Sequence, residues 1–450
     1  MKRGSWTTRF GFYLAAIGSA CGLGNLWRFP YVVGENGGGA FVLIYVLFAL
    51  LLGLPLLIGE LMLGKSTRRS VLTATAGLEQ ASWRPFHWMG RFSVLLSLVV
   101  LSYYAVVSGW VLHFLTQFFL NLFSSNVEVQ GSLFLLQKNG LLQLGLASVH
   151  LLITVIVVIR GVQEGLEKFI GAMMPAFAAL LALLMFRSLA LPNSIDALRF
   201  LFYPDFSKLT WSSMGQAVGH VFFTLSVGFG TMVTFGSYLK DSDHIPTAGF
   251  RVTLMDTFLS LISGLLIFPI VLQASNIPLT DPGLLFEALP RFLSTTRGGA
   301  LFGFAFFLCL YMAALGASIG LLEVIVSNAV DRKILSRSKA AWGTCFVTLI
   351  LAIGPALSGS VFRGVKIGGK GILEFLDSAL INWCLPLIAL GMSLALSYGM
   401  KKKTQEALFV DLQKVESAIL FPHWIFVLRY VVPGVITLAL LFQLIGIYLN

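Results

Sequence analysis

The sequence predicts an all-α integral membrane protein, and two observations carry this prediction. First, 57% of the 450 residues are hydrophobic and only 11% are charged, with a mean hydropathy of +0.86, whereas soluble domains have about 25% charged residues. Second, apolar segments of about 20 residues, enough to cross a bilayer, recur along the whole chain. No stretch is left for a sizeable soluble domain.

Eleven apolar segments of spanning length follow one another. The first is not a cleavable signal peptide, because a glycine-rich stretch continues it without a small-residue cleavage site. We therefore expect eleven transmembrane helices, near residues 10–33, 39–64, 91–122, 140–160, 166–190, 212–239, 249–275, 298–329, 340–358, 371–400 and 424–448.

The charged residues predict how the chain is oriented in the membrane. The net charge is +11, but the basic residues lie in short loops, so the positive-inside rule explains them better than nucleic-acid binding. When the N-terminus is placed in the cytoplasm, most Lys and Arg residues fall on the cytoplasmic side. An odd number of spans then places the C-terminus on the outer side. We expect the membrane to be the cell's inner (plasma) membrane. The cysteines all fall within spans and are expected to be buried hydrophobes without disulfides: Cys21, Cys309, Cys345 and Cys384.

Two of the predicted spans are interrupted by glycines. Residues 18–41 read GSACGLGNLWRFPYVVGENGGGAF, and residues 222–232 read FFTLSVGFGTM. Each glycine costs about 1 kcal/mol in a helix interior, and polar residues (Asn25, Thr224 and Ser226) stand beside the breaks, which mere close packing of helices does not require. Interrupted helices that open two five-span halves indicate an inverted-repeat transporter with its site at the membrane midplane.

These segments carry a family resemblance. SWTTRFGFYLAAIGSACGLGNLWRFPYVVGENGGGAF, followed by GLPLLIGELMLGK, resembles the bacterial amino-acid transporters of the neurotransmitter:sodium symporter family, which have the LeuT fold. SYYAVVSGW, RGVQEGLEKF, FFTLSVGFG, DTFLSLISG and FLDSALINWCLP extend the resemblance over the whole chain. It implies a first repeat over residues 1–190 (spans one to five), an inverted second repeat over 191–400 (spans six to ten), and a cytoplasmic loop with span eleven over 401–450.

The resemblance also implies a site for a zwitterion at the two breaks. Free amides near Leu23 and Gly24, with the Tyr104 hydroxyl, would hold the substrate carboxylate, and backbone carbonyls would hold its ammonium group. The pocket has no charged side chain, so we expect a neutral, apolar amino acid. The implied substrate residues are Ala20, Gly22, Leu23, Gly24, Val100, Tyr104, Phe223, Thr224, Ser226, Phe229, Ala317, Gly320 and Leu321.

A first sodium site is implied by a carboxylate in the middle of span seven. A carboxylate at this depth needs a cation or a proton, and its span has no basic residue after Arg251 to form a salt bridge. By resemblance the ion takes the substrate carboxylate, the Ala20 carbonyl and the side chains of Asn25, Thr224 and Asp256.

The second sodium site of the family is incomplete in this sequence. Its carbonyls would come from Gly18, Cys21 and Ala313, but its two hydroxyl positions are Gly316 and Ala317. The neighbouring Ser318 should face elsewhere, because one residue of helix is about 100° of rotation. Three possibilities stay open: coupling to one sodium ion, a weak second site completed by waters, or coupling to protons.

A chloride-like site and two gates complete the resemblance. Tyr45, His220, Thr224 and Ser260 match the family's chloride site, but Asp256 already supplies negative charge, so we expect no chloride requirement. A histidine there is more often a neutral core residue, with a titrating proton as the alternative.

The gates follow from charges near the span ends. Arg28 and Asp377 would close the outer side, and Arg3 and Asp331, with Trp6 and Tyr238, the inner side. The alternative is loop-end salt bridges without a gating role. Glu60 would brace the freed amides of both breaks, and Gly165 and Pro175 would weaken the start of span five.

The functional expectation is a secondary active symporter that takes up neutral, apolar amino acids by alternating access, driven by sodium through the first site. An enzyme is not expected, because the six histidines show no metal-ligand spacing. A channel would need a continuous polar pore. A transport-deficient amino-acid-binding sensor stays open as an alternative, given the incomplete second sodium site.

Overall fold

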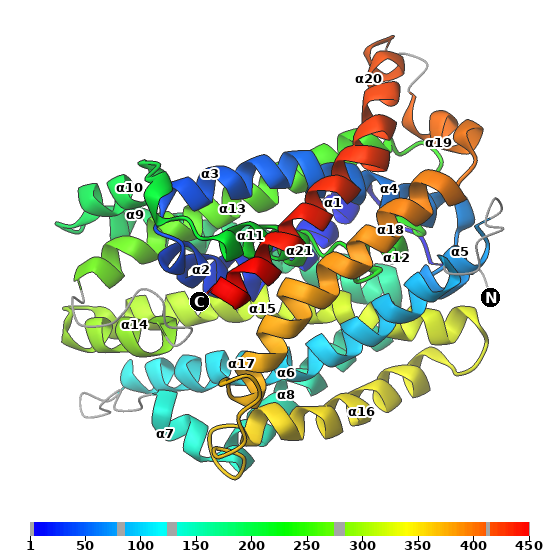
Figure 1. Cartoon of the computed structure of the whole chain (residues 1–450). Coiled ribbons are helices and arrows are strands. Elements are labelled where there is room, and N and C mark those ends of the chain that lie inside the picture. The colour runs from blue at the N-terminus through cyan, green and yellow to red at the C-terminus, as the bar shows by residue number, and fades with distance from the viewer. Residues whose placement is uncertain (1–3, 79–85, 124–132, 274–283, 411–414, 450) are drawn as a thin grey trace.

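Long apolar helices make up most of the chain (Figure 1). The computed structural model describes residues 4–78, 86–123, 133–273, 284–410 and 415–449. Within these ranges nine helical segments are long and apolar enough to cross a membrane, and each coincides with one of the predicted spans: Gly39–Thr67, Phe86–Asn121, Gly140–Ile159, Val162–Leu189, Ile245–Gln273, Gly299–Asp331, Arg337–Leu357, Ile372–Gly399 and Ser417–Gly446.

The other two predicted spans are the interrupted ones. In span one, α1 (Arg9–Ala20) stops before a short non-helical link, and the chain resumes through a π-helical turn, η1 (Gly24–Arg28), into α2 (Phe29–Glu35). In span six, residues 225–230 separate α11 (Trp211–Thr224) from α12 (Thr231–Gly236).

Positive backbone angles stop the helix in span six. Ser226, Gly228 and Gly230 have φ values of 53°, 86° and 78°, a region that glycine enters without strain and serine enters only at a cost. The chain therefore cannot continue as an α-helix between α11 and α12, and its amides and carbonyls are left for other partners.

The remaining elements complete the bundle. In chain order they are α3 (Gly39–Phe48), η2 (Ala49–Gly53), α4 (Leu54–Thr67), α5 (Val71–Ala76), α6 (Phe86–Asn121), α7 (Leu133–Lys138), α8 (Gly140–Ile159), η3 (Val162–Glu167), α9 (Lys168–Leu189), α10 (Ser194–Phe202), η4 (Phe206–Lys208), α13 (Ile245–Gln273), α14 (Leu284–Thr295), α15 (Gly299–Asp331), α16 (Arg337–Leu357), α17 (Ile372–Ala379), η5 (Leu380–Cys384), α18 (Leu385–Gly399), α19 (Lys402–Phe409), α20 (Val415–Phe426), η6 (Val427–Val431) and α21 (Val432–Leu449).

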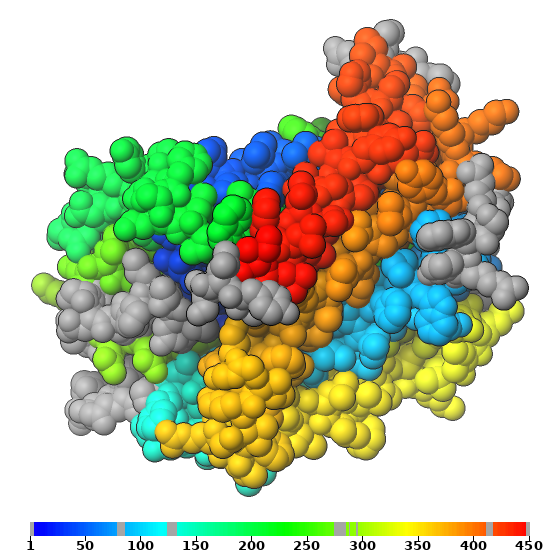
Figure 2. Space-filling model, viewed as in Figure 1, coloured from blue at the N-terminus to red at the C-terminus, as the bar shows by residue number. Residues whose placement is uncertain are grey.

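Two long helices, α6 and α15, form the centre of the bundle. They pack against each other over much of their length, and α15 also contacts α1, α8, α9 and α16. The interrupted spans lie beside them, since α1 packs on α15 and α13, and α12 packs on α4 and α15. In the space-filling view α18 and α21 cross the front face of the molecule (Figure 2). Both breaks are therefore surrounded by other helices.

Candidate functional site

The two interrupted segments lie against each other in the middle of the bundle. The Ser226 hydroxyl donates to the Ser19 carbonyl at 3.0 Å. A Cβ on Gly24 would lie 2.9 Å from the Phe223 ring, so only a glycine lets these two segments come this close. All residues predicted for the substrate site are buried.

Tyr104 of α6 reaches the break in span one. The Leu23 amide donates to its phenolic oxygen at 2.8 Å, so Tyr104 satisfies one of the amides that the break leaves free. A Cβ built on Gly22 would lie 2.7 Å from the same oxygen and 2.8 Å from Ala317 Cβ of α15. The span-one amides, the phenol and α15 thus meet at one point.

Aromatic rings lie on the span-six side of this point. Phe223 and Phe229 make an edge contact with ring centroids 6.2 Å apart, and the Phe229 carbonyl accepts from the Ser97 hydroxyl of α6 at 2.9 Å. On α15, a Cβ on Gly320 would lie 2.1 Å from Ser19 Oγ. Phe223, Phe229, Ala317 and Gly320 therefore lie around the two breaks. Val100 and Leu321 are buried in α6 and α15.

A buried carboxylate lies next to the break in span one. Asp256 of α13 is fully buried, and its Oδ1 accepts from Asn25 Nδ2 at 2.7 Å. Asn25 in turn accepts from the Gly22 amide at 3.1 Å through Oδ1. The Thr224 hydroxyl, on the neighbouring α11, donates to the Val221 carbonyl of its own helix at 3.2 Å. Within the described ranges no ion pair involves Asp256, so its charge is surrounded by neutral polar groups.

The predicted chloride-site residues divide into two sets. Tyr45 and Ser260 bond to each other at 2.9 Å and border the Asp256 carboxylate, with Tyr45 Oη 3.5 Å from Oδ2. His220 instead receives a hydrogen bond from Arg28 Nη1 at 3.2 Å on its Nδ1. A guanidinium only donates, so this nitrogen carries no proton. His220 thus belongs to the Arg28 contacts and only its ring packs on Tyr45.

The predicted outer pair is formed. Arg28, only 2% exposed, has its Nε 3.4 Å from Asp377 Oδ2 and donates from Nη2 to Asn382 Oδ1 at 2.8 Å. Tyr31 and Tyr103 donate to the same Asp377 carboxylate at 3.0 and 3.2 Å. Beyond this network a hollow of about 710 Å³ opens towards the end of the bundle. The sequence predicted the ion pair but not Tyr31, Tyr103 or Asn382, because their approach depends on how α2, α6 and η5 pack together.

The opposite side is closed by Trp6 and Tyr238. The Trp6 indole donates to the Phe235 carbonyl at 3.1 Å, and its amide donates to the Tyr238 carbonyl at 3.2 Å. Arg3 lies outside the described residues. Asp331 accepts from Ser70, from the amide at 2.7 Å and from the hydroxyl at 2.5 Å.

A carboxylate that the sequence reading missed holds this closure together. Glu323 of α15 is fully buried, accepts from the Tyr238 hydroxyl at 2.7 Å and forms an ion pair with Arg337 of α16. A signal was present, because a glutamate within the apolar run IGLLEVIV must find a partner inside a membrane protein. Glu167 was missed too, and it accepts from the amides of Thr7 and Thr8 just before α1.

Gly18 and Gly316, at two positions of the predicted second sodium site, are in direct contact. A Cβ on Gly316 would lie 2.3 Å from the Gly18 carbonyl oxygen, so α1 and α15 meet here without space for a side chain. Ser318 points to the other side, where its hydroxyl bonds to His150 Nε2 of α8 at 2.8 Å.

The two predicted structural features appear in part. Glu60 Oε1 accepts from the Gly228 amide at 2.8 Å, which braces the break in span six. No bond from Glu60 to the span-one break occurs among the residues described. Gly165 lies in the π-helical turn η3 and Pro175 inside α9.

Comparisons with known proteins agree with this architecture. The chain matches the model of the sodium:neurotransmitter symporter family over residues 3–130 and 123–449. It is 35% identical to the uncharacterized sodium-dependent transporter YhdH of Bacillus subtilis, over 98% of both chains, and 32% identical to a sodium-dependent transporter of Methanocaldococcus jannaschii, over 87% of this chain and 80% of that one. The crystal structure of MhsT in complex with L-phenylalanine superposes with a TM-score of 0.90, at 33% identity, over 98% of this chain and all of that chain. The chain belongs to the sodium:neurotransmitter symporter family, a family of transporters and not of enzymes.

Proposed function

We propose that the protein is a secondary active symporter that takes up neutral, apolar amino acids with sodium by alternating access. The observation that carries the proposal is the meeting of the two breaks, at Ser19 with Ser226 and at Gly24 with Phe223, next to Tyr104 and Ala317. None of the residues predicted for the substrate site has a charged side chain. The solved relative MhsT, which was crystallised with L-phenylalanine, supports this class of substrate.

Both charges of a zwitterion would be held by the backbone. The Leu23 and Gly24 amides at the start of η1, together with the Tyr104 hydroxyl, would bind the carboxylate, because helix starts favour anions. The carbonyls of Ala20, Phe223 and Thr224, with Ser226, would accept from the ammonium group. The side chain would lie among Val100, Phe223, Phe229, Ala317, Gly320 and Leu321, which select against charge.

The residues present fit one sodium ion. Asp256 is buried among neutral hydrogen-bonding groups without a basic partner in the described ranges, and a buried charge requires a counter-charge. The Ala20 carbonyl and the Asn25, Thr224 and Asp256 oxygens are ligands that suit a hard cation. When bound, the ion would supply positive charge beside the substrate carboxylate, which couples ion binding to amino-acid binding.

The residues present do not fit a second sodium ion. The Gly18 carbonyl rests on Gly316, and no side-chain oxygen comes from Gly316 or Ala317. This close contact favours coupling to one sodium ion over a second site completed by waters. Coupling to protons remains the alternative. His220 is not our candidate for the group that carries the proton, because its Nδ1 already accepts a hydrogen bond from Arg28. We expect no chloride requirement, because Asp256 provides the negative charge next to Tyr45 and Ser260.

The Arg28 and Asp377 network and the Trp6, Tyr238 and Glu323 network would act as the two gates. Both are closed in the described conformation, which is how an occluded carrier should look. The ion pairs of both networks are buried, with Arg28 2% and Glu323 0% exposed, so each pair would separate when water enters and hydrates both partners. Opening one network at a time would give alternating access.

Uptake of radiolabelled phenylalanine into proteoliposomes tests the proposal. We expect accumulation with an inward sodium gradient and none with a potassium or choline gradient. The Asp256→Asn variant should lose this sodium dependence while still folding, as judged by its thermal unfolding.

The outcomes separate the alternatives. Accumulation driven by a proton gradient alone would replace sodium coupling by proton coupling. Saturable binding without accumulation under any gradient would identify a sensor and overturn the symporter. A sodium-to-substrate flux ratio of two would contradict the single-ion assignment.

A further inference from the structure

A hollow of about 750 Å³ opens at the face of the bundle where α1 and α13 begin and α4 ends. It is separate from the site between the breaks. Basic and aromatic side chains line much of it, and the full lining is Arg9, Phe12, Tyr13, Lys65, Leu239, Asp241, Ser242, Asp243, His244, Thr247, Ala248, Arg251, Ala407, Leu408 and Val410. This is the face that the positive-inside rule places in the cytoplasm.

Two cations in the hollow have no carboxylate of their own. The Lys65 ammonium donates to the backbone carbonyls of Asp241 and Asp243, at 3.0 and 2.6 Å. Arg251 lies with its guanidinium carbon 5.3 Å from the centre of the Tyr13 ring. In the described part of the chain no ion pair involves either Lys65 or Arg251.

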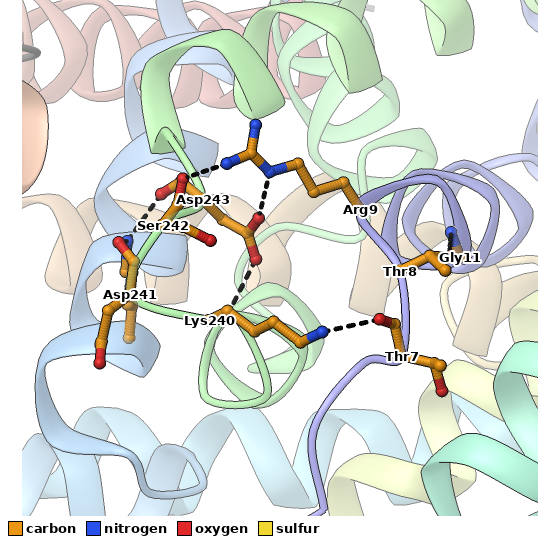
Figure 3. Close-up of polar contacts among 9 residues, drawn as sticks. Thr7, Thr8, Arg9, Gly11, Lys240, Asp241, Ser242 and Asp243 are labelled. Atoms are coloured by element: carbon orange, nitrogen blue, oxygen red, sulfur yellow. Dashed lines mark hydrogen bonds and ion pairs between the residues drawn. The ribbon is translucent and has the colours of Figure 1, made fainter.

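The carboxylates in the hollow are already paired. Asp243 forms an ion pair with Arg9 at 2.9 Å, and its Oδ2 accepts from the Lys240 amide at 2.9 Å. Figure 3 shows Arg9 reaching from α1 to Ser242 and Asp243 in the segment before α13. Asp241 pairs with Arg68, and its side chain is 97% exposed. Neither carboxylate is therefore available to form an ion pair with Lys65 or Arg251.

The histidine in the hollow is hydrogen-bonded through both of its ring nitrogens. His244 Nε2 lies 3.0 Å from the Phe409 carbonyl, so this nitrogen is the donor. Its Nδ1 lies 2.7 Å from Thr247 Oγ1, which can donate to it. Because no ion pair of Lys65 or Arg251 occurs among the described residues, the hollow is a positively charged cavity.

Lipid chains would run directly beside this cavity. Phe250, Leu254 and Phe258 of α13 are exposed by 49%, 51% and 53%, and Phe10 of α1 is exposed by 66%. Large apolar side chains that stand out from a membrane helix face acyl chains. Arg251 is itself exposed and lies next to Phe250 in sequence, so we expect its guanidinium group to lie where acyl chains meet headgroups.

We propose that this hollow binds the phosphate-bearing headgroup of an anionic phospholipid. The phosphate would be shared by Arg251 of α13 and Lys65 of α4, while the acyl chains lie along Phe250 and Leu254. Arginine and lysine both favour phosphate, and the attraction of basic groups to anionic lipid is strongest within a few ångströms of the membrane surface. A bound lipid would link α1, α4 and α13 at the end where the inner closure lies.

Native mass spectrometry of the delipidated protein tests this site. We expect phosphatidylglycerol to bind more tightly than phosphatidylcholine, and Arg251→Gln to weaken the binding of phosphatidylglycerol about fivefold, as expected for one basic group at a membrane surface. Arg251→Lys should retain most of the affinity. Arg160→Gln is the matched control, because Arg160 is an exposed arginine at the end of α8, outside the hollow.

Three results would overturn the proposal. The first is equal affinity for phosphatidylglycerol and phosphatidylcholine. The second is an equal loss of phosphatidylglycerol binding in Arg251→Gln and Arg160→Gln. The third is displacement of the lipid by inorganic phosphate at a similar concentration, which would make the ligand a soluble phosphate. Thermal unfolding of each variant checks that it is folded. The experiment measures lipid binding and not amino-acid uptake, so it tests the lipid site independently of the proposed symporter function.

Discussion

Replacing Tyr104 with phenylalanine is the sharpest test of the site between the breaks. In the described structure the Tyr104 oxygen accepts from the Leu23 amide at 2.8 Å, and in the proposed complex its hydroxyl donates to the substrate carboxylate. A hydrogen bond to a charged group contributes about 1.5–3 kcal/mol. Since about 1.4 kcal/mol is a factor of ten, the lost bond alone should weaken binding about 10- to 150-fold.

The free protein partly offsets this loss. In Tyr104→Phe the buried Leu23 amide has no acceptor until the substrate carboxylate arrives, so the free variant is also less stable. The difference between free and bound states is therefore smaller than the bond itself, and we expect the lower end of the range, about tenfold. Isothermal titration with phenylalanine in sodium buffer measures the effect.

Tyr103→Phe is the matched control for this measurement. Tyr103 precedes Tyr104 on α6, is equally buried, and donates to Asp377 in the outer network at 3.2 Å. Its loss removes one bond of the outer gate but no predicted substrate contact. If Tyr104→Phe changed the dissociation constant by less than twofold, or by no more than Tyr103→Phe, the carboxylate would not lie at the span-one amides.

Three further changes test the rest of the site. Asp256→Asn should make amino-acid binding indifferent to sodium, and sodium-stimulated binding in this variant would rule out the proposed ion site. Gly316→Ala should lower the unfolding temperature, because its Cβ would meet a span-one carbonyl oxygen at 2.3 Å and overpacking costs about 1–3 kcal/mol; Gly343→Ala, with open space around it, should not. Glu323→Gln should also lower the unfolding temperature, by leaving Arg337 without its carboxylate; an unchanged melting curve would contradict this role.

The sequence predicted the architecture well because its signals are strong in a membrane. Apolar length alone located the nine continuous spans, since lipid leaves little choice but helix. The breaks were predicted because Gly228 and Gly230 carry out a task that other residues perform poorly, namely adopting positive φ. Asn25 and Asp256 are polar residues in apolar surroundings, and they indicated that the breaks lie next to a binding site.

Partners brought by packing were beyond the reach of the sequence. Tyr31, Tyr103 and Asn382 come from three different elements, and only their packing around Asp377 makes them part of one network. Their residue types occur throughout membrane helices, so no spacing rule selects them. The predicted reach of Glu60 to both breaks depended in the same way on distances that a sequence does not contain.

Residues 18 and 316 show how a sequence can reveal a loss but not its structural consequence. The absence of hydroxyls at Gly316 and Ala317 was visible from the sequence. It left three possibilities open: a weak second sodium site completed by waters, coupling to a single sodium ion, or coupling to protons instead of sodium. The close approach of the Gly18 carbonyl to Gly316 is the observation on which we base the proposal of one sodium ion, because two helices in van der Waals contact need no ion to join them. Glycine at 316 thus has a packing role of its own, for which a hydroxyl would be too large. Under the proposed coupling to a single ion, this contact would join the two helices without sodium, and the sodium gradient would act through Asp256.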